Sequence, residues 1–160
     1  MINYRRFAIL ALGLITVFLF ASFVIAQTGD DSGDLEKLDG SWNVEVTVES
    51  QGATFPALIT FGADGSIVAD EPPLPGETSG HGNWVRNDDG QAAYTFEALY
   101  SGDSGEYAGK LKVVGTLQFD ASTEAWQGPF KIAVFDADGQ ATYSDQGTFH
   151  LTRISIESMS

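Results

Sequence analysis

The chain has 160 residues, enough for one domain but hardly for two. Its 22 Asp and Glu outweigh eight Lys and Arg, giving a formal net charge of −14, and so acidic a surface repels nucleic acid and anionic lipid headgroups. The chain has no cysteine, which excludes disulfides, thiolate catalysis and thiolate metal sites.

The first 26 residues predict an export segment. Arg5 and Arg6 precede an uncharged apolar run at 7–26 that ends on the small residue Ala26, which is the layout of a secretory signal peptide. The run is also long enough to span a bilayer, so an uncleaved signal anchor is the alternative. The two arginines stay on the cytoplasmic side in either case. We therefore expect a secreted domain or, alternatively, a membrane-anchored domain that faces outward.

The rest of the chain divides into three parts. Residues 27–37 are polar and acidic and predict a flexible linker. Residues 38–155 predict one β-domain, and residues 156–160 form a short polar tail.

Alternating side chains predict the strands of this domain. At 41–49, Trp42, Val44, Val46 and Val48 alternate with polar residues, as in a strand with one buried face. The same reasoning predicts further strands at 55–61, 66–69, 81–86, 92–100, 107–120, 125–135 and 141–154. Most are joined by short turns such as Asp64-Gly65, a strong hairpin signal.

Residues 70–79 form the longest predicted loop, because they hold three of the five prolines and proline cannot donate to a β-ladder. Eight strands joined mainly by hairpins favour an all-β fold, a single antiparallel up-and-down barrel that leaves no exposed edge. Such a barrel has room for packed side chains or for one small ligand. A β-sandwich is the alternative, although it would need long crossing connections.

Gly40-Ser41-Trp42, at the start of the first strand, resembles the opening of a lipocalin or calycin-type barrel. This resemblance implies that Trp42 plugs the closed end of the barrel and that a basic residue on the last strand packs across its ring. Arg153 is the matching candidate, and contact between guanidinium and indole is physically favourable. Gly40, Trp42 and Arg153 are thus expected to have structural roles.

Aromatic residues are the best candidates for a binding site, because rings inside a barrel can hold an apolar small molecule. A filled core without a pocket is the alternative. His81 lies between two glycines beside the proline-rich loop, where it could orient a ligand or simply face solvent. The residues expected to contact a ligand are Trp42, Phe61, His81, Trp84, Tyr94, Phe96, Tyr100 and Phe130.

No motif for metal binding or catalysis stands out. His81 and His150 fall on distant strands, and Asp136-Ala137-Asp138-Gly139 resembles the start of a calcium loop without the glutamate that should follow. A Gly-x-Ser-x-Gly nucleophile motif is absent. We therefore expect no metal, no cofactor and no catalytic residue.

The sequence thus predicts a secreted barrel that binds a small apolar ligand, as a monomer or weak homodimer. It predicts no nucleic acid partner, and membrane contact only through an uncleaved N-terminal segment. The alternatives are a barrel cyclase or isomerase acting on a hydrophobic substrate, and a structural envelope-associated domain without a ligand.

Overall fold

The computed structural model describes residues 37–72 and 76–159. The predicted export segment and residues 27–36 of the predicted linker lie outside the described residues. The described residues form eight β-strands, and each agrees with its predicted range to within about two residues at either end. They are β1 (Gly40–Val48), β2 (Ala53–Phe61), β3 (Ser66–Asp70), β4 (Gly80–Arg86), β5 (Ala92–Ser101), β6 (Tyr107–Asp120), β7 (Ala125–Asp136) and β8 (Ala141–Arg153).

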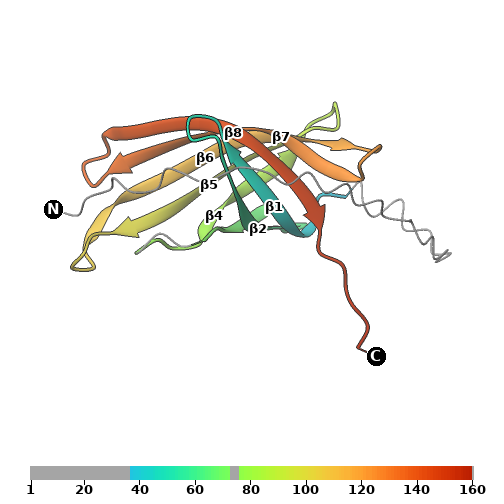
Figure 1. Cartoon of the computed structure of the whole chain (residues 1–160), viewed down its shortest axis with the longest axis horizontal. Coiled ribbons are helices and arrows are strands. Elements are labelled where there is room, and N and C mark those ends of the chain that lie inside the picture. Colours follow the sequence, from blue (N-terminus) through green and yellow to red (C-terminus); the bar gives the residue numbers. More distant parts are fainter. Residues whose placement is uncertain (1–36, 73–75, 160) are drawn as a thin grey trace, which may run out of the picture.

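The strands follow one another in chain order around a closed antiparallel barrel (Figure 1). β8 closes the wall by pairing with β1, from Trp42 opposite Arg153 to Val48 opposite Gly147. The predicted up-and-down barrel is therefore confirmed, and the sandwich alternative is wrong because the sheet closes on itself. Closure pairs the first strand with the last and so protects both edges.

Alternation along each strand sends apolar side chains into the barrel. On β1 the four alternating residues Trp42, Val44, Val46 and Val48 are buried, while the intervening positions are less buried. Asp-Gly turns favour the hairpins: in the β2–β3 turn, the Asp64 carboxylate accepts a hydrogen bond from the Ser66 amide at 3.0 Å, and Gly65 has a φ of 84°.

Two tryptophans seal the end of the barrel where β1 begins. Trp42 and Trp126 are fully buried, and the Trp42 indole N–H donates to the Leu38 carbonyl at 2.8 Å. The Arg153 guanidinium covers Trp42, and that of Arg86 covers Trp126, with Cζ 4.5 and 5.0 Å from the respective ring centres. We call this side the closed end.

The opposite end is open and uneven, because β5–β8 have 10 to 14 residues whereas β1–β4 have five to nine (Figure 1). The β1–β2 turn is attached to the projecting part of β8, since the Glu49 amide donates to the Gln146 carbonyl at 3.0 Å and the Ser50 hydroxyl donates to the Asp145 carboxylate. Across residues 37–72 and 76–159, we find no helix of the length and apolarity needed to cross a bilayer.

Candidate ligand-binding cavity

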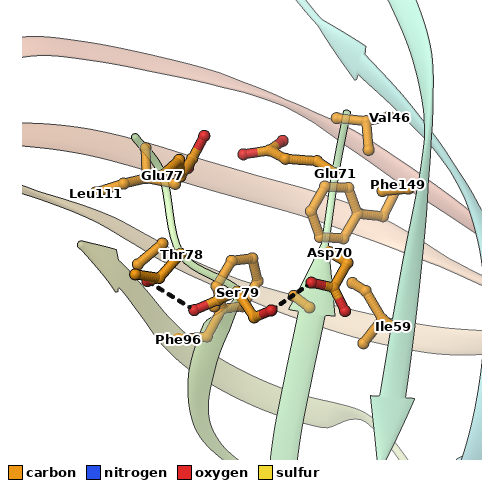
Figure 2. Close-up of a pocket in the computed structure, with 14 residues that line it drawn as sticks. Val46, Ile59, Asp70, Glu71, Glu77, Thr78, Ser79, Phe96, Leu111 and Phe149 are labelled. Carbon is orange, nitrogen blue, oxygen red and sulfur yellow. Dashed lines mark hydrogen bonds between the residues drawn. The ribbon is translucent and has the colours of Figure 1, made fainter. Parts of the chain in front are cut away.

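A cavity of about 340 Å³ lies inside the open end of the barrel. Its walls are mainly apolar and come from β1, β2, β3, β5, β6 and β8. Its rim is formed by described residues at the two ends of the chain segment that connects β3 and β4 (Figure 2). The lining residues are Val46, Ala57, Ile59, Ala69, Asp70, Glu71, Glu77, Thr78, Ser79, Gly80, Phe96, Ala98, Leu111 and Phe149.

Small side chains explain why this part of the barrel is hollow. Ala57, Ala69 and Ala98 occupy inward positions where larger side chains would fill the space. Gly80 leaves room for the Phe96 ring, because a Cβ atom at this position would lie 2.7 Å from that ring. The cavity is therefore set by side-chain size at a few inward positions of β2, β3, β4 and β5.

Stacked aromatic rings form the floor of the cavity and fill the barrel below it. The Tyr94 ring stacks on those of Phe96 and Phe149, with centroids 6.3 and 5.9 Å away, and Phe130 lies 4.5 Å from Phe149. Two inward glycines make room for these rings, since a Cβ at Gly147 would lie 2.8 Å from Phe130 and one at Gly115 2.4 Å from the Tyr94 hydroxyl. This floor separates the cavity from the closed end.

Two carboxyl groups occupy the rim. Figure 2 shows the side chains of Glu71 and Glu77 turned toward one another above the apolar lining. The pKa of Glu71 is raised from its ordinary value of 4.5 to about 7, first by burial and then by the negative charge and the hydrogen bond of Glu77. Near neutral pH this rim can therefore bind or release a proton.

Hydrogen bonds hold the rim in place. The Thr78 amide donates to the Leu99 carbonyl at 2.9 Å, and the Leu99 amide donates to the Thr78 hydroxyl at 3.0 Å. The Ser101 amide donates to the Gly76 carbonyl at 3.0 Å, so residues 76–79 run along β5. On the other side, the Ser79 hydroxyl donates to the Asp70 carboxylate at 2.5 Å (Figure 2).

Of the eight residues expected to contact a ligand, Phe96 lines the cavity itself. Tyr94 and Phe130 lie in and beneath the floor, and Trp42 lies at the closed end. Three others lie elsewhere. Phe61 and Trp84 pack edge to face at 5.9 Å, with the Trp84 indole N–H donating to the Gly62 carbonyl, and the Tyr100 hydroxyl donates to the Phe135 carbonyl at 2.8 Å.

His81 is exposed on the outer face of β4, opposite Val68 on β3 and Glu97 on β5. The residues expected to have structural roles lie together, because a Cβ at Gly40 would fall 2.5 Å from the Arg153 guanidinium that covers Trp42. Within the residues that the structure describes, no group of three or more His, Asp or Glu side chains is placed to hold a metal ion.

The two rim carboxyls were not among the predicted site residues. A signal for Glu71 exists in the sequence, because Ile67 and Ala69 are the inward residues of β3 and Glu71 is the next position in that alternation. Glu77 has no comparable signal, since it follows the prolines and its place is set by an isolated bridge to Tyr100.

The Tyr94 hydroxyl is a polar group in the interior of the barrel, below the rim carboxyls. Tyr94 is only 4% exposed, its hydroxyl has no hydrogen-bond partner among the described residues, and burial raises its pKa. Such a group destabilises a fold unless it is partnered.

Comparisons of the chain with protein-family models, curated proteins and solved structures find no significant match. The functional assignment therefore depends on the cavity.

Proposed function

We propose that the barrel binds one small apolar molecule in the cavity at its open end. The observation that carries this proposal is an apolar hollow of about 340 Å³ inside a barrel whose other end is sealed. Ligand pockets commonly have volumes of roughly 300–1,000 Å³ with mostly apolar walls and a few polar groups, so this cavity suits a small ligand.

The cost of an empty cavity supports this proposal. Apolar residues around a void lose contacts that a close-packed interior would supply, and larger side chains at the alanine positions would recover them. A domain with a purely structural role gains nothing from such a hollow. Binding therefore explains the cavity better than the structural alternative does.

A binding assay with an apolar fluorescent polyene tests the proposal. We expect saturable binding to the wild-type barrel and loss of binding in Ala98→Leu, because Ala98 is buried and lines the cavity. Ala93→Leu is the matched control, since Ala93 lies on the outer face of the same strand. The proposal fails if the probe does not saturate, or if both variants bind it as the wild type does.

The N-terminal sequence and the resemblance to lipocalins further suggest that the barrel acts outside the cytoplasm. Mass spectrometry of the protein from expressing cells tests this part. A mature chain starting at Gln27 in the extracytoplasmic fraction indicates secretion, whereas an intact N-terminus in the membrane fraction indicates an anchor. Recovery of the full chain in the cytoplasm would contradict export.

The rim favours a second candidate function, acid–base chemistry on a hydrophobic substrate by a barrel cyclase or isomerase. A carboxyl group with a pKa of about 7 can donate or accept a proton at neutral pH, which suits Glu71 to this role. Incubation with a polyene followed by mass spectrometry and chromatography separates the candidates. Unchanged polyene indicates a binding protein, and an isomer formed by the wild type but not by Glu71→Gln indicates an enzyme.

A further inference from the structure

The inward direction of both rim carboxyls follows from the backbone. Ile67 and Ala69 are the buried positions of β3, so Glu71 continues the inward side of that strand. Glu77 forms a bridge with Tyr100, which belongs to the inward series Phe96, Ala98 and Tyr100 of β5. The continuation of β3 and the bridge to β5 thus place Glu71 and Glu77 at the cavity with their side chains turned toward one another (Figure 2).

No Lys or Arg is among the described residues that line the cavity. Arg86 and Arg153 cover the tryptophans at the closed end. On the outer wall, Lys110 forms a salt bridge with Glu97 at 2.9 Å, and Lys112 lies 3.9 Å from the same carboxylate. The described residues that line the mouth therefore carry acidic side chains and no basic ones, which favours a negative potential there.

The ionisable groups that face Glu71 come from few elements. Asp70 and Glu77 line the cavity with it, whereas β2 and β6 contribute Ala57, Ile59 and Leu111 there. The Tyr100 hydroxyl, on the strand next to Glu77, donates to the Phe135 carbonyl. The charge at the mouth therefore depends on the three acids, and above all on the pair that shares a hydrogen bond.

We propose, building on the proposed function, that the ligand is a small amphiphilic amine whose apolar part fills the cavity and whose ammonium group lies between Glu71 and Glu77. An ammonium in this position makes charge-assisted hydrogen bonds in a partly dehydrated site, where they are strong. A carboxylate in the same position would be repelled. The apolar floor of Phe96 and Phe149 selects only for a hydrophobic tail, so the rim determines the head group.

Proton linkage gives this inference a second signature. An alkylamine stays protonated throughout the range from pH 5 to pH 8, as a lysine side chain does. Glu71, in contrast, passes from mostly neutral to mostly charged over this range, because its pKa is about 7. Amine binding is therefore expected to strengthen as the pH rises, whereas binding of a neutral alcohol of the same length is expected to stay nearly constant.

The experiment compares octylamine, octanol and octanoate by isothermal titration calorimetry at pH 5 and pH 8. At pH 8, we expect octylamine to bind roughly ten times more tightly than octanoate, and this preference to disappear in the double variant Glu71→Gln/Glu77→Gln. Octanol binding should survive in that variant, which also shows that it folds. The control Glu45→Gln/Glu157→Gln removes the same number of charges from exposed positions and should keep the preference.

The outcomes separate the two proposals. If octanol and octanoate bind as tightly as octylamine, the amine assignment is overturned and the binding function stands. Persistence of the amine preference in the double rim variant also overturns the assignment. If none of the three compounds binds the wild-type protein, the proposed binding function fails as well.

Discussion

The Arg153 guanidinium lies over the Trp42 ring with Cζ 4.5 Å from its centre, and the two residues are partners in the pairing of β8 with β1. The same guanidinium donates to the Asp39 carbonyl at 3.2 Å and to the Lys37 carbonyl. One side chain thus connects the last strand, the first strand and the segment that precedes it. The closed end depends on this connection.

We expect Arg153→Ala to lower the free energy of unfolding by about 2–3 kcal/mol, because it removes the cation–π contact and both hydrogen bonds to backbone carbonyls. Arg153→Lys keeps the charge but loses the planar guanidinium group, so its free energy of unfolding should lie between those of the wild type and Arg153→Ala. Urea unfolding followed by tryptophan fluorescence measures both. Equal stability of the alanine variant and the wild type would show that Arg153 does not hold the closed end.

Tyr94→Phe should stabilise the barrel by about 1 kcal/mol. The substitution keeps the ring that stacks on Phe96 and Phe149 and removes a buried hydroxyl that has no described partner. Thermal unfolding checks the sign. The control is Tyr143→Phe, which removes a hydroxyl that donates to the Asp145 carboxylate at 2.6 Å at an exposed site and should not stabilise the protein. A destabilised Tyr94→Phe variant would mean that the buried hydroxyl is satisfied.

Glu71 should make stability fall as the pH rises from about 4.5 to about 7. The pKa of Glu71 is higher in the folded protein than its ordinary value of 4.5, so the folded state binds more protons than the unfolded state in this pH window. The stabilising contribution of Glu71 is therefore fully present below this window and is lost as the pH rises through it. After allowance for solvent at the rim, the change is of order 1–2 kcal/mol. Glu71→Gln should therefore be more stable than the wild type at pH 8 and equally stable at pH 4.

Urea unfolding of the wild type, Glu71→Gln and Glu45→Gln at several pH values checks this prediction. Because the chain carries many other acids, the informative quantity is the difference between each variant and the wild type. Glu45 is exposed on the outer face of β1, and its variant should show no such pH-dependent gain. Parallel pH profiles for the wild type and Glu71→Gln would contradict the assignment.

Gly147→Ala should cost several kcal/mol, because its Cβ would lie 1.9 Å from the Thr47 carbonyl and 2.8 Å from the Phe130 ring. Gly139→Ala offers a matched comparison, since Gly139 lies in an open turn with a φ of 80° and its Cβ would meet nothing within 4 Å. Only backbone strain of about 1–2 kcal/mol is expected there. Similar losses in both variants, measured by urea unfolding, would contradict the packing of Phe130 on Gly147.

The barrel could be predicted from the sequence because each strand has a clear period of two. Trp42, Val44, Val46 and Val48 mark the inward side of β1, and Asp-Gly pairs mark the turns. Hairpins in succession leave few arrangements other than a meander that closes. The contact between Arg153 and Trp42, which the resemblance to lipocalin-type barrels implied, lies where β8 pairs with β1.

The cavity could not be predicted in the same way, because a period of two shows which side chains point inward but not how much space they leave. Large rings such as Phe130 and Tyr94 fill the interior, while Ala69 and Ala98 leave it open. The acidic rim was missed for another reason. Prolines interrupt the strand pattern between Glu71 and Glu77, and the pairing of residues 76–79 with β5, including the bridge to Tyr100, brings the second carboxyl inward.

The pairing of β1 with β8 also constrains how the protein folds. Residues at opposite ends of the domain must meet before the wall is complete, so the nascent chain cannot finish its tertiary structure until the last strand has been synthesised. Contacts between such distant residues carry a large loop-closure entropy and slow the folding of β-proteins. The hairpins can form early, but the pairing of β1 with β8 can be completed only after Arg153 has been synthesised.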